Sequence, residues 1–273
     1  MKKMGVRKRD RSLKNANLSN EYLFQQVMLN KKINKMVLEE LLLIKIDKIK
    51  SIRIEDVKKL KRKSKGIRLD VFIRDNKGNA YDIEMQGYDD DLGRRSGYYH
   101  SIMQMEITTD GMKYKDIPDR YVIFISTYDY VGLGMYVNTF STRCNEDYKK
   151  VLNDGKHTII FNTQGTKGEV TETQKEFLEY INDSSHKKTR KLKTKFVKEV
   201  AKYTEIVRVE KEEEYMGVVS TLAMEYKDIG EAKGIDLTIE VLNLYKSGKT
   251  VQEIMEITKL SKTKIEKMMK ILK

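Results

Sequence analysis

The chain has 273 residues, of which 39% are hydrophobic and 35% charged, and its formal net charge is +13. No apolar run approaches the roughly 18 residues of a membrane-spanning helix, and no signal-peptide stretch follows the basic start, so a cytoplasmic protein is expected. The single cysteine excludes an internal disulfide. The three histidines lack metal-ligand spacing, which argues against zinc sites and Cys/His catalysis.

The charge is unevenly distributed along the chain. Residues 1–68 carry a net charge of +14, residues 69–182 carry −6 and residues 183–273 carry +5. Basic flanks attract polyanions by counterion release, whereas clustered carboxylates repel phosphate unless a metal intervenes. The pattern favours a nucleic-acid partner and metal-dependent phosphodiester chemistry in the middle of the chain. A solvated lysine-rich surface is the plainer alternative.

Composition and periodicity divide the chain into four segments: a basic tail (1–18), a folded core (19–182), a helical arm (183–246) and a small terminal unit (247–273). The core begins with a predicted helix from Ser19 or Asn20, either of which is a plausible N-cap, to about residue 43.

A strand is predicted over residues 44–57, ahead of the basic loop KKLKRKSKG at 58–66. Lysine and arginine in this loop would hold phosphates through contacts that carry no sequence information. A solvated run of charge is the alternative.

Residues 67–87, IRLDVFIRDNKGNAYDIEMQG, predict an antiparallel hairpin. Both arms alternate apolar and polar residues with the period of two that marks strands, and DNKGN between them suits a tight reversal. A reversal centred on Lys77 places Asp70 directly opposite Glu84. A register slip of one residue would turn Asp70 to the other face.

Asp70 and Glu84 would then be like charges with Cβ atoms about 5 Å apart, which is destabilising. A hard divalent cation would offset the repulsion, and Mg²⁺ is typically held by one or two carboxylates together with waters and a substrate phosphate. Gln86 points to the same face, where its neutral amide would orient a metal-bound water without deprotonating it. The alternative is a half-exposed hairpin with a polar outer face.

The remaining core elements follow in order. A helix over 92–110 follows three aspartates, and strands are predicted at 121–126, 136–140 and 157–162. A TQKE capping box at Thr173 predicts a helix to about residue 182. An antiparallel hairpin combined with a parallel crossover gives an α/β fold with a mixed sheet.

The terminal unit has the spacing of a helix-turn-helix. Its last 24 residues predict two short helices capped by Thr250 and Ser261, with exposed lysines on the second. Two amphipathic helices joined by a turn also form ordinary bundle ends, which is the alternative.

Four stretches together, GIRLDVFIRDNKGNAYDIEMQ, GRRSGYYHSIM, YVIFIST and LNDGKHTIIFNTQG, resemble the PD-(D/E)XK nuclease family transposases, which are related to recombination-promoting nucleases. The resemblance spans about Ser19 to Asn182 and extends loosely to the terminal KTVQEIMEITKLSKTKIEKM. It implies a restriction-endonuclease-like αβββαβ core and Mg²⁺-dependent DNA cleavage, with Mn²⁺ as a substitute ion.

The resemblance also implies roles for single residues. Asp70 and Glu84 match the two metal-binding acids, the carbonyl of Met85 adds a ligand, and Gln86 occupies the position that is lysine in the superfamily motif. Glu39 matches an accessory acid. Residues expected to bind nucleic acid, or in the case of the tyrosines to pack, are Lys61, Arg62, Lys63, Lys65, Arg68, Arg94, Arg95, Tyr98 and Tyr99.

The leading hypothesis is therefore a Mg²⁺-dependent endodeoxyribonuclease acting in recombination, mobile-element maintenance or defence. A nuclease-fold DNA-binding protein without turnover is the alternative, and RNA cleavage is a third hypothesis, because scissile phosphates look alike. No organic cofactor and no membrane partner are expected. A homodimer would supply the two cuts of a double-strand break.

Overall fold

The computed structural model describes residues 12–54, 70–88, 90–217, 220, 237–245, 247 and 249–269. Within these residues, no helix has the length and apolar character needed to cross a membrane. The chain divides into two compact units between Glu213 and Glu214.

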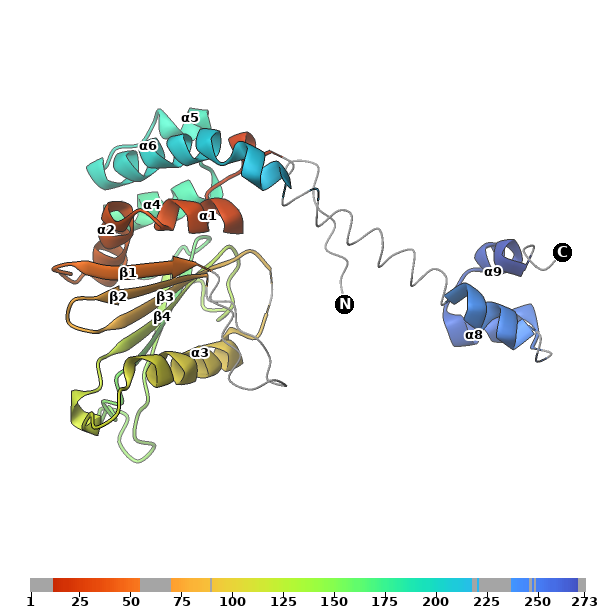
Figure 1. Cartoon of the computed structure of the whole chain (residues 1–273), viewed down its shortest axis with the longest axis horizontal. Helices are drawn as coiled ribbons and strands as arrows, with labels where there is room; N and C mark the ends of the chain where they lie inside the picture. The colour runs from red at the N-terminus through yellow and green to blue at the C-terminus, as the bar shows by residue number, and fades with distance from the viewer. Residues whose placement is uncertain are drawn as a thin grey trace. The chain divides into compact units, whose positions relative to one another are not determined.

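The first unit is built on a six-stranded sheet with the order β1-β2-β3-β4-β6-β5 (Figure 1). The strands β1 to β3 are antiparallel, β3, β4 and β6 are parallel, and β5 is antiparallel to β6. The predicted α/β fold with a mixed central sheet is confirmed. The strand bounds are β1 (Ile49–Ile54), β2 (Val71–Asp75), β3 (Ala80–Gln86), β4 (Arg120–Ser126), β5 (Val137–Phe140) and β6 (Lys156–Asn162).

Helices cover both faces of the sheet. On one face, α3 (Leu92–Ile107) buries Tyr99, Ile102 and Met103 against an apolar cluster that includes Phe72 and Phe124 of the strands. On the other face lie α1 (Glu21–Met28), α2 (Lys31–Leu42) and α4 (Glu172–Asn182), as Figure 1 shows. Two short 3₁₀ helices also occur in this unit: η2 (Leu13–Asn15) precedes α1, and η3 (Tyr114–Asp116) lies between α3 and β4 in the chain.

The prediction of one helix from residue 19 or 20 to residue 43 is wrong, because the segment forms two helices. Asn20 caps α1 as predicted, through a hydrogen bond that its side chain accepts from Leu23 N. A second cap follows at Asn30, whose side chain accepts from Lys32 N and Ile33 N and so starts α2. A side chain that bonds its own helix start competes with helix continuation, which explains the break.

The start of α4 also differs from the prediction. Thr171 and Gln174 form the capping box, so the cap lies two residues before the one expected at Thr173. Gln174 also donates through Nε2 to the carbonyls of Glu40 and Leu41, which ties the start of α4 to the end of α2. The cap patterns at Thr171 and Thr173 overlap in the sequence, and the bonds of Gln174 to α2 favour the cap at Thr171.

The hairpin has the predicted register. Val71 lies opposite Ile83, so Asp70, one residue before β2, is aligned with Glu84. The turn is held by Asp75, whose carboxylate accepts hydrogen bonds from Lys77 N and Asn79 N. Residues 67–69 of the predicted first arm, and the basic loop at 58–66, lie outside the described residues.

Beyond the core, α5 (His186–Thr189) precedes α6 (Lys195–Glu210), which packs against α1 and α4. The second unit contains a helix at 237–245, α8 (Val251–Thr258) and α9 (Lys262–Met269). The boundaries predicted at residues 183 and 247 stay a prediction.

Candidate active site

Asp70 and Glu84 are joined directly across the open end of the hairpin. The Asp70 backbone N–H donates to Glu84 Oε1 at 3.0 Å, and Met85 N donates to Asp70 Oδ2 at 3.1 Å. Each acid therefore bonds the backbone of the other's strand. This reciprocal pairing fixes both carboxylates on one scaffold of two strands, where positions are more rigid than on loops.

The strand β3 places three polar side chains on the face covered by α3. Asp82, Glu84 and Gln86 alternate along this central strand and are only 0%, 1% and 3% exposed. A strand lying between two others beneath a helix is normally apolar on that face. Charged side chains in such a place are costly unless they are paired or bind an ion, which makes the row a candidate functional site.

Arg95 of α3 supplies the cation in this row. Its Nη2 donates to Glu84 Oε2 at 2.6 Å and its Nη1 to Gln86 Oε1 at 2.7 Å. The guanidinium also donates to Tyr99 Oη and to Asp90 Oδ2. Arg95 thus joins the carboxylate of Glu84 to the amide of Gln86. Sequence reasoning assigned it to nucleic-acid binding, because the helix-to-strand contact is not encoded in local spacing.

Two residues of α1 border Asp70 and were missed by the sequence analysis. Gln25, which is 4% exposed, donates through Nε2 to Asp70 Oδ1 at 3.1 Å. Glu21 lies one turn earlier and repels the Asp70 carboxylate. The only signal in the sequence is a polar residue at an inward position of an apolar helix.

Burial and like charge raise the pKa of all three acids. Burial first, and then repulsion from Glu21, raise the pKa of Asp70 to about 7. The pKa of Glu84 is raised by burial first and then by Asp82 and Asp70. Burial followed by Asp70 raises the pKa of Asp82. Arg95 opposes the rise in each pKa, but one guanidinium faces three carboxyl groups.

This imbalance of charge fits a divalent cation. Neither carboxylate oxygen of Asp82 accepts a hydrogen bond from a donor in the described residues, and its close neighbour is the Glu84 carboxylate. In that part of the chain, no set of three or more His, Cys, Asp or Glu side chains is arranged to hold a metal ion. Two carboxylates and a carbonyl form a partial ligand set, which water and phosphate would complete. Mg²⁺ is usually bound in this way and not by a cage of protein ligands alone.

Of the other predicted site residues, Tyr99 borders the row, where its Oη lies 3.4 Å from Glu84 Oε2, and the others that the structure describes lie elsewhere. Glu39 accepts a hydrogen bond from Ile46 N at 2.9 Å, which ties it to the segment after α2. The side chain of Arg94 is 92% exposed and pairs with Asp91. Tyr98 packs against the apolar cluster beneath α3, and Tyr99 is buried there. The positions that lie outside the described residues are Lys61, Arg62, Lys63, Lys65 and Arg68.

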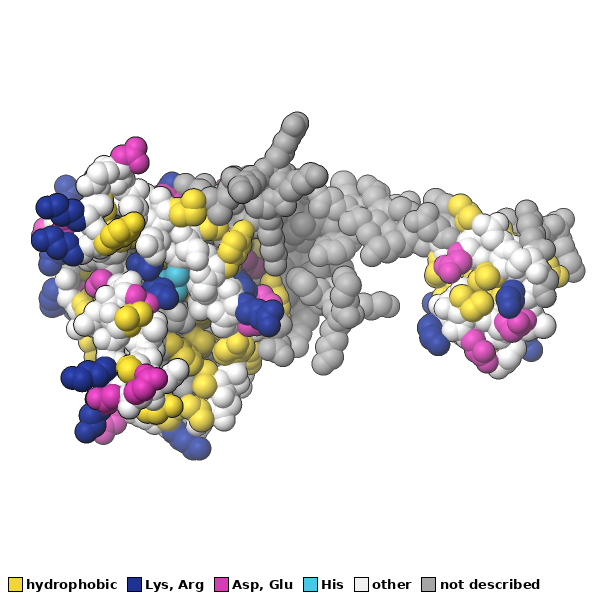
Figure 2. Space-filling model, turned by 90° about the horizontal axis from the view of Figure 1, so that it is seen from below, with side chains coloured by type: hydrophobic (Ala, Val, Ile, Leu, Met, Phe, Trp, Pro, Cys, Tyr) yellow, Lys and Arg dark blue, Asp and Glu magenta, His cyan; other side chains and the backbone are white. Residues whose placement is uncertain are grey.

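The described surface that is visible in Figure 2 carries charges of both signs. In the view of Figure 2, Lys and Arg side chains of the described residues stand among Asp and Glu side chains. The basic loop at 58–66 lies outside the described residues, so its binding of phosphate stays a prediction from the sequence.

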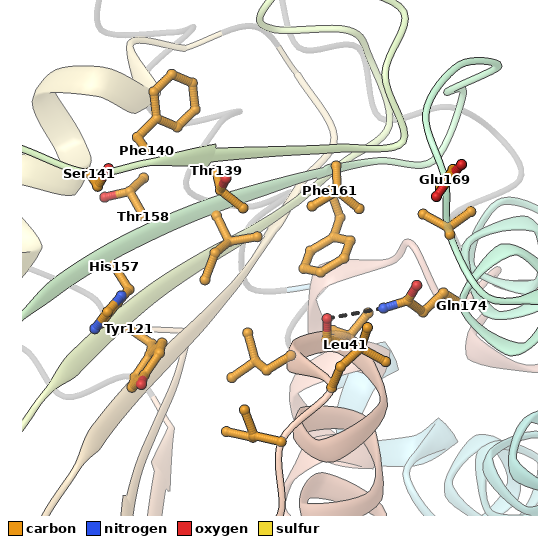
Figure 3. Close-up of a pocket in the computed structure, with 16 residues that line it drawn as sticks. Leu41, Tyr121, Thr139, Phe140, Ser141, His157, Thr158, Phe161, Glu169 and Gln174 are labelled. Atoms are coloured by element: carbon orange, nitrogen blue, oxygen red, sulfur yellow. Dashed lines mark hydrogen bonds between the residues drawn. The ribbon is translucent and has the colours of Figure 1, made fainter. Parts of the chain in front are cut away.

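A cavity of about 450 Å³ lies on the sheet face turned away from α3, between the end of α2 and the strands β5 and β6 (Figure 3). The rings of Tyr121 and His157 stack there with centroids 4.4 Å apart. Glu169 is the one acidic residue lining it, and none of the predicted catalytic residues does so. The cavity is thus not the candidate active site.

Comparison with known families gives a match to the model described as PD-(D/E)XK nuclease family transposase, over residues 18–227. The match includes Asp70, Glu84, Gln86 and Arg95. No curated protein and no solved structure matches the chain significantly.

Proposed function

Because the chain belongs to the PD-(D/E)XK nuclease family transposases, which supports a nuclease-like function, we propose that it is a metal-dependent endodeoxyribonuclease. The observation that carries the proposal is the buried pair Asp70 and Glu84, each bonded to the backbone of the other's strand. Its substrate would be DNA, and its ion would be Mg²⁺, with Mn²⁺ as a substitute.

Asp70, Glu84 and the carbonyl of Met85 would hold the cation at the open end of the hairpin. When bound, a divalent ion supplies a Lewis acid for phosphodiester hydrolysis. Gln25 holds the Asp70 carboxylate in place through Oδ1. The second lone pair of Asp70 Oδ1 and that of Glu84 Oε1 remain open for the ion.

Gln86 would orient the attacking water. Its Oε1 already accepts a hydrogen bond from Arg95 Nη1, which fixes the amide so that a second lone pair of Oε1 can accept a hydrogen bond from water. A neutral amide positions a nucleophile but is too weak a base to remove its proton. The guanidinium of Arg95, which bonds Glu84 and Gln86, would contribute positive charge that stabilises the negative charge developing on the phosphate.

Nicking of supercoiled plasmid tests the proposal, with Mg²⁺, with Mn²⁺ and with EDTA. Asp70→Ala and Glu84→Ala should each lower the nicking rate at least about 1,000-fold, because loss of the ion removes several kcal/mol of charge stabilisation. Asp110→Ala, which removes an exposed acid after α3, is the matched control and should cleave like the wild type. Metal-independent nicking, or full activity of Asp70→Ala, would refute the proposal.

One observation favours a second candidate function, a nuclease-fold DNA-binding protein without turnover. Arg95 bonds Glu84 and Gln86 at once, so part of the buried charge is compensated without a metal. Calorimetry separates the two functions. Mg²⁺ binding that is lost in Glu84→Ala supports the nuclease, whereas plasmid binding with no detectable Mg²⁺ signal supports the second candidate.

A further inference from the structure

The second unit has a small apolar centre of its own. Val241, Ile254 and Ile265, which come from the helix at 237–245, α8 and α9 in turn, are fully buried, and Met255 and Met268 pack around them. Three short helices that share one centre hold their faces in a fixed arrangement. The outward side of the last helix, α9, is therefore a defined surface.

The connection between α8 and α9 has the length of the turn in a helix-turn-helix. Thr250 and Glu253 form a capping box at the start of α8, and the helix ends at Lys259, whose φ of 56° is left-handed. Residues 259–261 form the turn, and Lys264 N and Ile265 N bond the Ser261 carbonyl as α9 begins. A three- or four-residue turn between two helices is the spacing of DNA-binding units whose second helix enters the major groove.

The exposed side of α9 is polar and basic. Ser261, Lys262, Thr263 and Lys264 are exposed in its first turn, while Ile265 faces the centre. Over residues 259–266 three lysines, Lys259, Lys262 and Lys264, and one acid, Glu266, are exposed, and Lys262 Nζ lies 3.9 Å from Glu266 Oε1. A basic strip beside a helix start with a hydroxyl group matches the requirements of a DNA groove, where cations meet phosphates and short polar side chains meet base edges.

We propose that the second unit is a duplex-DNA-binding site in its own right, with α9 lying in the major groove. Lys259 and Lys264 neutralise phosphates on the flanks, and Lys262 and Thr263 contact base edges. The unit then selects where the protein binds on DNA. This goes beyond the proposed nuclease activity, which needs no sequence preference.

The affinity of the full chain for a fluorescein-labelled random-sequence duplex, titrated over a range of salt in EDTA, tests the phosphate contacts. The double variant Lys259→Gln/Lys264→Gln should lower the slope of log affinity against log salt by about 2 and weaken binding about tenfold. The matched control is Lys149→Gln/Lys150→Gln, which removes two exposed lysines from a loop of the first unit. An equal effect of both doubles, or no change in either, would overturn the proposal.

Selection from a pool of random duplexes tests the base contacts. The wild type should enrich a common sequence, and Thr263→Ala should relax the preference at one position while leaving the salt slope unchanged. If the wild type enriches no sequence, the surface serves packing and not DNA selection. If Lys259→Gln/Lys264→Gln changes the molecular mass of the protein in solution but not its DNA affinity, the surface serves self-association. Both assays measure binding in EDTA, so their failure would leave the nicking result intact.

Discussion

At the scale of single residues, Arg95 is placed to supply the positively charged side chain that Gln86 cannot provide. By the family resemblance, position 86 corresponds to the lysine of the superfamily motif. In this chain the residue is Gln86, whose side chain is a neutral amide. Arg95 Nη1 lies 2.7 Å from Gln86 Oε1 and Nη2 lies 2.6 Å from Glu84 Oε2. The guanidinium therefore stands beside the amide, at the place that a lysine ammonium from β3 would approach.

If Arg95 supplies this cation, Arg95→Gln should lower the nicking rate about 100-fold, the usual cost of losing one charge-stabilising donor. Adding Gln86→Lys to that variant should restore at least part of the rate, because the ammonium returns the charge from the other side of the site. The measurement is single-turnover plasmid nicking at a temperature where circular dichroism shows every variant folded.

The neighbouring Arg94 provides the matched control, because its side chain is exposed and pairs only with Asp91 among the described residues. Arg94→Gln should leave the nicking rate within about threefold of the wild type. A double variant no faster than Arg95→Gln alone, with a native melting curve, would argue against a catalytic role for the Arg95 charge.

A second residue-scale prediction concerns His100, on α3. The imidazole is 4% exposed, its Nε2 lies 2.9 Å from Thr158 Oγ1, and burial lowers its pKa to about 4. Below pH 6.5 the unfolded chain binds a proton that the folded chain does not, so this histidine destabilises the fold as the pH falls toward 4. The loss is about 3 kcal/mol at most.

Urea unfolding at pH 7 and pH 4 measures this effect. The wild type should lose more stability over that interval than His100→Gln, whereas His186→Gln, at an exposed histidine of α5, should lose as much as the wild type. Equal losses for the wild type and His100→Gln would show that His100 does not titrate with folding.

The residues that sequence reasoning brought together, and those it missed, differ in how far apart they lie in the chain. Asp70 and Glu84 were expected to face each other, because strand alternation and a turn at Lys77 fix both positions within one hairpin. Gln25 and Arg95 reach the same site from helices, and only tertiary packing decides which helical side chains point inward. Hairpin contacts follow from local rules, and helix-to-strand contacts do not.

At the scale of elements, the break between α1 and α2 has a consequence for the site. The cap at Asn30 stops α1 after Met28, and α1 carries Gln25, whose amide bonds Asp70. Helical periodicity runs across the break, so the apolar pattern alone predicts one helix. A helix cap can interrupt an apolar pattern of this kind. Asn30, in the middle of the pattern, was the signal in the sequence that could have predicted the break.

Asn30→Ala should lower the free energy of unfolding by about 1 kcal/mol, the usual cost of losing a cap, and Asn30→Ser should recover most of the loss. Denaturant unfolding of the full chain measures the difference. Lys31→Ala, at the exposed first position of α2, serves as the control and should change stability little. A stable Asn30→Ala protein would mean that tertiary packing alone sets the break.

At the scale of the whole molecule, the proposals place DNA cleavage in the first unit and DNA selection in the second. Asp70, Glu84, Gln86 and Arg95 all belong to the first unit, and the helices around Ile254 belong to the second. Units with separate apolar cores fold largely independently, and changes in one are then additive with changes in the other. Cleavage chemistry and DNA selection should accordingly be separable by mutation.

Ile254→Asp tests this separation, because it places a charge in the fully buried centre of the second unit. The helices α8 and α9 should lose their packing, since an unpaired buried charge costs more than so small a core supplies. Metal-dependent nicking at low salt and saturating protein should stay within about threefold of the wild type. DNA affinity at physiological salt should fall about tenfold, as phosphate contacts are lost.

The same helix provides the control, because Ile257 of α8 is 49% exposed. Ile257→Asp adds the same charge without entering the apolar centre, so it should preserve both nicking and affinity. If Ile254→Asp abolished nicking while the first unit kept its melting transition, the second unit would be part of the catalytic machinery. Retained nicking with weakened binding would instead show that the chemistry resides in the first unit and that the second unit directs it to DNA.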